Sequence, residues 1–139
     1  MAADKVPVPN SVVETLRRDP DVKFAVAFGS RVEGHSRAGS DLDVGVKFSD
    51  ALTSGERFRK RCRLSGRLQS DEAPFVDVSD LDSLPPDVAR AAVKGELLCG
   101  DDDDRRKFDE RIEALAEDAQ SAERHRDVIR RVAEEGLRG

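Results

Sequence analysis

The sequence predicts a single-domain α/β protein of the α+β kind, in which helices flank a small mixed β-sheet and a long helix ends the chain. Three observations predict this fold. Short apolar runs alternate with stretches of helical periodicity, the 139 residues suffice for one core but not for two, and the last quarter of the chain reads as one helix. We expect residues 1–139 to form one domain, with a core over 1–100 and a C-terminal helix over 101–139.

Two strands buried on both faces are expected in the first half of the chain. Ser11 and Glu14 have capping-box spacing at the start of a short helix, which the Asp-Pro-Asp sequence at 19–21 ends. The apolar runs at 22–28 and 42–48 follow. Because neither run alternates with polar residues, both are typical of strands that are covered on both sides.

A basic helix over 57–68 is expected next. Thr53 and Glu56 have the spacing of a second capping box at its start. Its apolar side chains available for packing are Phe58, Cys62, Leu64 and Leu68. The basic residues between them are expected to form a solvated face, because a net charge of −5 disfavours direct binding of nucleic acid.

The second half of the chain begins with a short strand, expected over 75–78, in which Asp77 lies between two valines. A double proline then introduces a short helix over 88–94, and Gly95 ends it. Residues 96–99 are a candidate edge strand.

A long helix is expected from the acidic run at 101–104 to about residue 135. Its apolar residues recur mostly at steps of three and four: Phe108, Ile112, Leu115, Ala119, Ala122, Ile129 and Ala133. Capping and the helix dipole explain the acidic run better than a metal site does. We expect the first half of the helix to pack on the sheet, and an exposed remainder of its apolar stripe to offer a surface to a partner.

The cysteines and the hydropathy indicate the cellular compartment. Cys62 and Cys99 lack the spacing of a metal site and are expected to be reduced thiols. No apolar run is long enough to span a bilayer, and the N-terminal residues lack a signal-peptide core. We therefore expect a soluble, cytoplasmic protein with no membrane partner.

The connection between the first two strands has the residues of a phosphate and metal site. Gly29-Ser30 follows the first strand directly, where the glycine lets the backbone approach a phosphate and the serine hydroxyl can donate to its oxygens. Asp41 and Asp43 are two residues apart on the next strand, so their carboxylates share one face and suit a hard cation such as Mg²⁺. No GxxxxGK[ST] pattern occurs in the sequence, so the site is not a P-loop.

Asp77 joins these carboxylates if the three strands pair in one sheet. Two metal ions could then activate an attacking hydroxyl and neutralise a pyrophosphate leaving group, while Asp77 orients or deprotonates the nucleophile. An unpaired carboxylate inside the apolar run at Asp43 would be costly, which favours a bound cation. An ordinary turn at Gly29-Ser30 and a structural salt bridge at Asp77 remain open as alternatives.

These residues together resemble the minimal nucleotidyltransferase family of the polymerase-beta superfamily. The resemblance rests on Gly29-Ser30, ten intervening residues, Asp41-Leu42-Asp43 and the later strand with Asp77. It implies a polymerase-beta-like nucleotidyltransferase fold with 1–100 as catalytic core, ATP as substrate and two Mg²⁺ ions as cofactor. Many members resemble antitoxins that pair with a HEPN-domain RNase toxin and silence it by adenylylating one of its tyrosines.

The resemblance also implies roles for individual residues. The candidate catalytic and metal-binding acids are Asp41, Asp43 and Asp77. The candidate nucleotide-binding residues are Gly29, Ser30, Arg31 and Ser40. The implied partner is a HEPN toxin in a hetero-oligomer, and because this chain has no tyrosine, a tyrosine acceptor must belong to that partner.

Three other functions stay open at this point. A nucleotidyltransferase acting on a small molecule, such as an antibiotic hydroxyl, would usually need a further substrate-binding domain. An antitoxin could instead neutralise its toxin by binding alone. An RNA-directed nucleotidyltransferase is disfavoured by the net negative charge.

Overall fold

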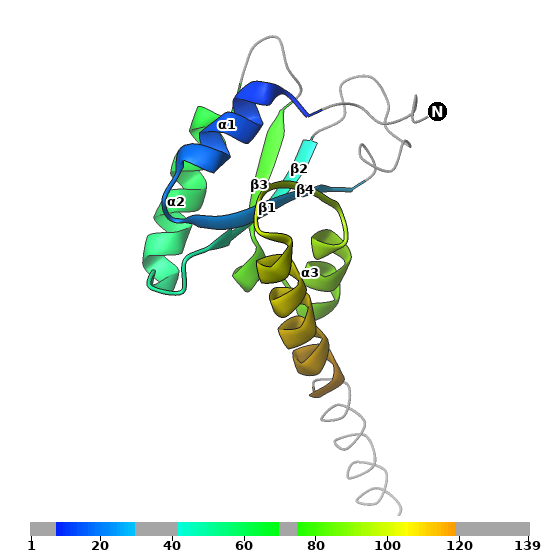
Figure 1. Cartoon of the computed structure of the whole chain (residues 1–139). Coiled ribbons are helices and arrows are strands. Elements are labelled where there is room, and N and C mark those ends of the chain that lie inside the picture. The colour runs from blue at the N-terminus through cyan, green and yellow to red at the C-terminus, as the bar shows by residue number, and fades with distance from the viewer. Residues whose placement is uncertain (1–7, 30–41, 70–74, 119–139) are drawn as a thin grey trace, which may run out of the picture.

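The computed structural model describes residues 8–29, 42–69 and 75–118. Within them, four strands form one mixed sheet in the order β3-β2-β1-β4 (Figure 1). The strands are β1 (Val22–Phe28), β2 (Leu42–Phe48), β3 (Val76–Asp80) and β4 (Glu96–Gly100). β1 is antiparallel to both β2 and β4, whereas β2 and β3 are parallel. The predicted mixed sheet is thus confirmed, with β3 and β4 at its edges.

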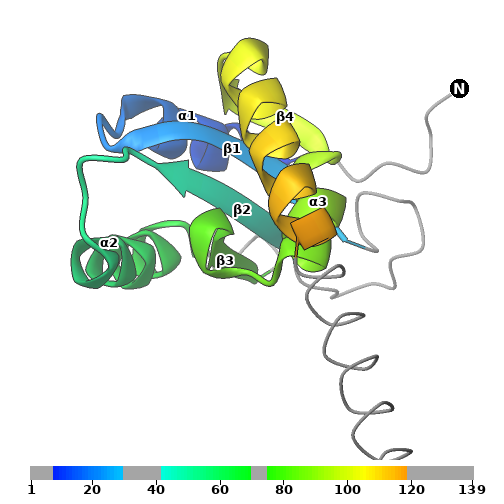
Figure 2. The same ribbon diagram turned by 90° about the horizontal axis from the view of Figure 1, so that it is seen from below.

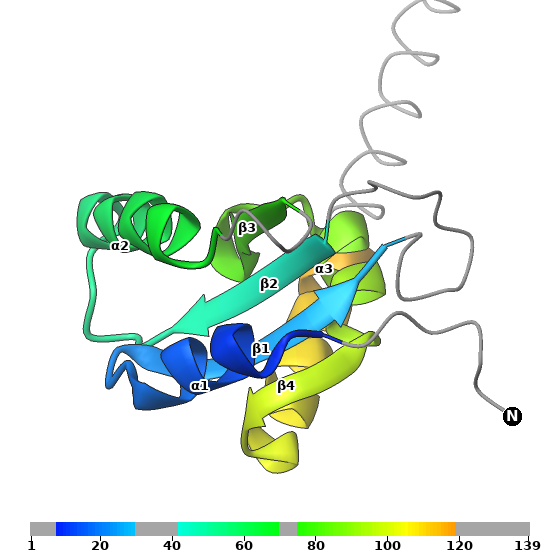
Figure 3. The ribbon, with the colours of Figure 1, turned by 90° about the horizontal axis from the view of Figure 1, so that it is seen from above.

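Helices cover both faces of this sheet. α1 (Asn10–Arg18) and α2 (Ser54–Arg67) pack on one face, as Figure 3 shows from above. α3 (Pro86–Val93) and a helix over 102–118 pack on the other, which Figure 2 shows from below. A short 3₁₀ helix, η1 (Leu81–Ser83), links β3 to α3 and was not foreseen in the sequence.

Two apolar layers hold these helices to the sheet. Side chains alternate between the faces of a strand, so neighbouring residues of one strand enter different layers. The layer beneath α1 and α2 includes Val12, Leu16, Leu64, Val44 and Phe48. The layer beneath α3 and the 102–118 helix includes Phe24, Val26, Leu81, Phe108 and Ile112. The bounds of β1 and β2 are those that the apolar runs predicted.

The capping box predicted for α2 is confirmed. Thr53 Oγ1 accepts a hydrogen bond of 3.2 Å from the Glu56 N–H, and Glu56 Oε1 accepts one of 2.9 Å from the Thr53 N–H. These bonds satisfy donors that the first turn of a helix leaves without partners.

The capping box predicted for α1 is wrong. This helix begins at Asn10 after Pro9, and no side chain caps it. Ser11 therefore lies inside the helix, and Glu14 forms a 2.9 Å ion pair with Arg17. The spacing is the same as in α2, but here Pro9 holds the N-cap position and its carbonyl accepts from the Val12 and Val13 N–H groups, so the helix has already begun before Ser11.

Packing of α2 departs from the prediction at two positions. Leu64 and Leu68 are buried as expected, but Phe58 is 58% exposed and Cys62 is exposed too. The buried apolar stripe of α2, which contains Leu64 and Leu68, is narrow because several of the positions beside it are basic rather than apolar.

Two of the basic residues of α2, Arg57 and Lys60, form ion pairs. Arg57 Nε donates to Asp80 of β3 at 2.9 Å, and Lys60 Nζ donates to Asp19 at 2.7 Å. Both acids are buried, so charged hydrogen bonds fix α2 to β3 through Asp80 and to the end of α1 through Asp19. The expectation of a wholly solvated basic face is wrong for these two residues.

The last described helix runs over 102–118. Phe108 and Ile112 are buried against the sheet, while Leu115 is 49% exposed. Asp101 Oδ1 accepts a 3.0 Å hydrogen bond from the Asp103 N–H, as expected of an acidic helix start. The remaining predicted apolar positions, from Ala119 onwards, lie outside the described residues.

Two smaller expectations can be compared with the structure. Both cysteines, Cys62 and Cys99, are free thiols. In the ranges that the structure covers, no helix combines the length and the hydropathy that crossing a membrane requires.

Candidate active site

Asp43 and Asp77 lie side by side on the two parallel strands. The pairing register sets Asp43 of β2 opposite Asp77 of β3. Residues opposite each other in a sheet point to the same face, and neighbouring strands are about 4.8 Å apart. The two side chains therefore project together where β2 and β3 begin, on the face that α3 also covers.

The exposure of these acids differs from the expectation. Asp43 is half-buried and Asp77 is exposed, so the reasoning from a carboxylate buried in an apolar run is wrong. Both residues stand near the starts of their strands, and β3 is an edge strand, so solvent reaches them. Proximity now supports a cation instead, because like charges directly opposite each other destabilise a sheet and a shared cation removes that repulsion.

Gly29 closes this group from the end of β1. Its φ of +90° is in the region that favours glycine. A Cβ at this position would overlap the carboxylate oxygen Oδ2 of Asp43 and stand 3.2 Å from its Cγ. The backbone at Gly29 thus lies directly against the Asp43 carboxylate, and a residue with a side chain at this position would force that carboxylate to shift.

Four predicted site residues lie outside the described residues: Ser30, Arg31, Ser40 and Asp41. Their roles remain predictions. Across the described ranges, no cluster of three or more His, Cys, Asp or Glu side chains is arranged to hold a metal ion. Asp43 and Asp77 supply two carboxylates, and the sequence assigns the third to Asp41.

The structure disfavours the salt-bridge interpretation of Asp77. Among the described residues, Asp77 has no ion-pair or hydrogen-bond partner at its side chain. Asp80 on the same strand behaves differently, since it accepts hydrogen bonds of 2.9 Å from both Arg57 and Ser83. β3 therefore has one acid that fixes the fold and one that faces outward with its carboxylate available.

Lys47 is a charged residue on this face that the sequence analysis missed. It is 3% exposed and donates to Asp50 at 2.8 Å and to Asp82 at 2.9 Å. The hydrogen bond from Lys47 holds the pKa of Asp50 below its usual range, with the positive charges of Lys47 and Lys23 adding to the effect. Lys47 is four residues beyond Asp43 on the same strand, about 13 Å away, so it anchors the far end of the face. Its signal in the sequence is a lone lysine within an apolar run.

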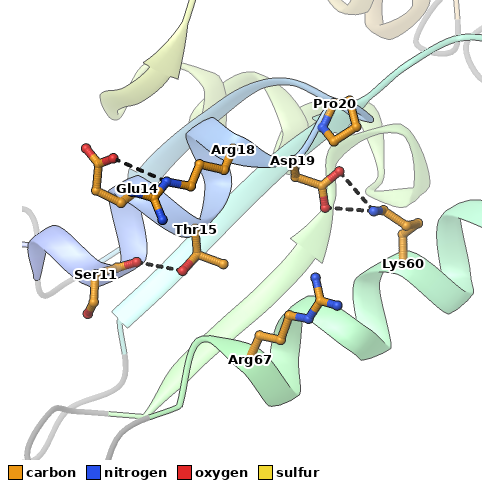
Figure 4. A pocket seen from close by; sticks show the side chains of 8 residues that line it. All are labelled: Ser11, Glu14, Thr15, Arg18, Asp19, Pro20, Lys60 and Arg67. Atoms are coloured by element: carbon orange, nitrogen blue, oxygen red, sulfur yellow. Dashed lines mark hydrogen bonds and ion pairs between the residues drawn. The ribbon is translucent and has the colours of Figure 1, made fainter.

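Two grooves of the described structure are lined in part by residues of α2. One, of about 490 Å³, runs between α1 and α2, with Thr15, Arg18 and Arg67 on its walls and the Asp19–Lys60 ion pair at one side (Figure 4). It belongs to the α1–α2 face and so lies away from the acidic pair. The other, of about 270 Å³, includes Asp77 itself.

A family match agrees with this geometry. Residues 10–104, well over half of the chain, match the family described as polymerase beta, nucleotidyltransferase. The chain belongs to this family. The matched region of this nucleotidyltransferase includes Gly29, Asp43 and Asp77, and extends from α1 to the start of the 102–118 helix. The family and the fold expected from the sequence are thereby confirmed.

One relative and two solved structures are similar to this chain. The nucleotidyltransferase is 30% identical over 101 residues to the protein adenylyltransferase MntA of Shewanella oneidensis, covering 71% of this chain and 70% of MntA. Its fold is similar to that in a crystal structure of a toxin-antitoxin with AMP-PNP, with a TM-score of 0.69 and 24% identity over 88% of this chain and 99% of that one. It is also similar to a chain in a structure of tri-AMPylated Shewanella oneidensis HEPN toxin in complex with MNT antitoxin, with a TM-score of 0.60 and 24% identity, covering 84% of this chain and 92% of that one.

Proposed function

We propose that this nucleotidyltransferase is an antitoxin that transfers AMP from ATP to a hydroxyl, that of a tyrosine, on a HEPN-domain toxin. The observation that carries the proposal is the register that sets Asp43 beside Asp77 in a member of a nucleotidyltransferase family. The relative MntA is a protein adenylyltransferase, and a structure of similar fold contains an AMPylated HEPN toxin.

The two described acids suit a divalent cation. Each offers carboxylate oxygens, the donors that Mg²⁺ prefers, and they occupy opposed positions on one face. Asp43 and Asp77, with Asp41 as the third acid, would hold Mg²⁺. When bound, Mg²⁺ neutralises charge on the triphosphate and on the departing pyrophosphate.

Gly29, Ser30 and Asp77 have separate roles in the transfer. Gly29 lets the backbone lie against the Asp43 carboxylate, and the hydroxyl of Ser30 donates to a phosphate oxygen. The acceptor hydroxyl oxygen forms a bond to the α-phosphorus, the bond from that phosphorus to the bridging oxygen breaks, and pyrophosphate leaves with the electron pair. Asp77 takes the hydroxyl proton, since its carboxylate is exposed at the edge strand.

The composition excludes self-modification of this chain on tyrosine. The sequence contains no tyrosine, so modification of a tyrosine can only take place on another protein. The similarity to MntA extends over 70% of that protein, which favours a shared reaction.

The proposal is tested by incubating the purified chain with a candidate HEPN-domain partner and with ATP labelled at the α-phosphate. We expect label on the HEPN protein, and none when the label is on the γ-phosphate, because AMP rather than phosphate is transferred. The double variant Asp43→Asn/Asp77→Asn removes both carboxylates at nearly constant volume, and we expect it to transfer no AMP.

Asp87→Asn is the matched control. It makes the same change at an exposed acid in the first turn of α3, outside the acidic pair, and should transfer AMP at the rate of the unaltered chain. Transfer that survives the double substitution would show that the site is wrongly assigned. If the double variant still silences the toxin without labelling it, neutralisation occurs by binding alone.

A further inference from the structure

The groove at Asp77 lies beyond the edge of the sheet. Its walls include Phe58 and Arg61 of α2, Asp77 and Ser79 of β3, and Ser83 and Leu84. Its volume of about 270 Å³ is smaller than the roughly 300 to 1,000 Å³ that enclose a drug-sized ligand. A groove of this size accommodates one or two side chains of a protein.

The order of the strands places this groove opposite the phosphate side of the site. Phe28, the neighbour of Gly29, pairs with Asp43, and Asp43 pairs with Asp77, so the three strand positions follow one another across the sheet. Gly29 adjoins Asp43 from the β1 side, where phosphate is expected, whereas β3 has no further strand beyond it among the described residues. A nucleotide held at Gly29 leaves the β3 edge as the open approach to Asp77.

Two aromatic side chains near Asp77 are exposed. The chain has six phenylalanines and no tryptophan or tyrosine. Phe58, in the groove, is 58% exposed, and Phe75, two residues before Asp77, is 54% exposed. Large apolar side chains left in water next to a polar site are typical of a surface that a partner covers.

Arg61 adds a positive charge to a groove whose walls also include Asp77 and Asp80. Its guanidinium stacks on the Phe58 ring at 5.2 Å from the ring centre, and no described carboxylate pairs with it. The other half-buried basic residues of α2, Arg57 and Lys60, are both in ion pairs. A planar cation stacked on an aromatic ring beside a groove is well suited to a carboxylate from another protein.

We propose that this groove docks the segment of the partner protein that carries the acceptor hydroxyl. Arg61 binds an acidic side chain of that segment and Phe58 contacts an apolar one, which brings the hydroxyl to Asp77 from the β3 edge. The inference rests on the proposed AMP transfer and adds to it the chemistry of the acceptor: an acidic and an apolar side chain close to the modified residue.

The test measures AMP transfer against the concentration of the HEPN-domain protein for three variants of α2. Arg61→Glu is expected to raise the KM for the HEPN protein by about fivefold or more and to leave the KM for ATP unchanged, because the loss of a charge at the rim of an interface acts on association. Phe58→Ala is expected to raise the same KM, whereas Arg61→Lys, which keeps the charge but not the planar stacking group, should give a KM between those of the unaltered chain and Arg61→Glu.

Arg63→Glu is the matched control. It makes the same charge reversal two residues further along α2, at an exposed arginine that does not line the groove. We expect a KM for the HEPN protein near that of the unaltered chain. Because this chain has no tryptophan or tyrosine, fluorescence from those residues reports the HEPN protein alone and gives its binding affinity independently of transfer.

The two proposals fail in different ways. If the unaltered chain transfers no AMP to the HEPN protein, the proposed function is wrong and this inference falls with it. If the unaltered chain transfers AMP but Arg61→Glu and Arg63→Glu behave alike, only the docking groove is wrong. A rise in the KM for ATP in Arg61→Glu would assign the groove to the nucleotide and would also overturn the inference. Far-UV circular dichroism checks that each variant is folded.

Discussion

Substituting Gly29 by alanine tests the geometry of the site with the smallest change. The new methyl group meets the Asp43 carboxylate, and the backbone must hold a φ of +90° that an alanine adopts only with strain. Two outcomes follow from one substitution, because the strain acts on stability while the displacement of Asp43 acts on catalysis.

The structure allows both magnitudes to be estimated. A left-handed conformation costs a residue with a Cβ about 1–2 kcal/mol, and the overlap with Asp43 adds to that. We therefore expect Gly29→Ala to lower the free energy of unfolding by about 1–3 kcal/mol. The overlap is relieved if the Asp43 carboxylate shifts by about 1 Å. AMP transfer then falls by roughly a hundredfold, because a positioning error of that size in an active site lowers the rate by about that factor.

Urea unfolding followed by far-UV circular dichroism measures the first quantity, and the rate of AMP transfer at saturating substrates measures the second. Gly66→Ala is the matched control, because Gly66 lies in α2 with nothing within 4 Å of the added methyl group. It should raise stability by about 0.5–1 kcal/mol and leave transfer unchanged. A Gly29→Ala chain as stable and as active as the unaltered one would refute the close approach of Gly29 to Asp43.

Two further predictions concern the far end of the sheet and the thiols. Lys47→Met removes the ion pairs to Asp50 and Asp82 and should lower the free energy of unfolding at neutral pH by about 1–3 kcal/mol. Because Lys47 lowers the pKa of Asp50, this carboxylate adds stability above its unfolded pKa of about 4 and loses that contribution as the pH falls through its lower folded pKa. Urea midpoints measured from neutral pH to about pH 3 should thus fall less steeply for Lys47→Met, and equal slopes would contradict the coupling. Maleimide should label Cys62 in the folded chain but reach Cys99 only after unfolding, since burial raises the pKa of the Cys99 thiol; mass spectrometry that finds both labelled at the same rate would show the burial to be wrong.

Local patterns predicted the elements of the fold well. The apolar runs gave the bounds of β1 and β2, and the capping box at Thr53 and Glu56 marked the start of α2. The same spacing failed at Ser11 because α1 begins one residue earlier, after Pro9, so Ser11 lies inside the helix. A capping pattern marks a helix start only where the chain has not already entered the helix before it.

Charged side chains in apolar surroundings were predicted less well. In the sequence, Lys47 is a polar residue that interrupts an apolar run. In the structure its side chain is buried, because Asp50 from a turn and Asp82 from η1 form ion pairs with it. β3 extends to Asp80 because Arg57 of α2 neutralises that acid. In both cases the partner lies far away in the sequence or in a turn, where no periodicity signals it.

The sequence by itself determined the order of the elements, the types of the candidate site residues and the shared face of side chains two apart on one strand, because each of these follows from local backbone geometry. Only the tertiary structure decided that Asp77 stands opposite Asp43, that β3 is an edge strand and that Phe58 and Arg61 line a groove at Asp77. Strand register and helix placement depend on which distant segments bury their apolar surface together, and a shift of one residue would turn Asp77 to the other face.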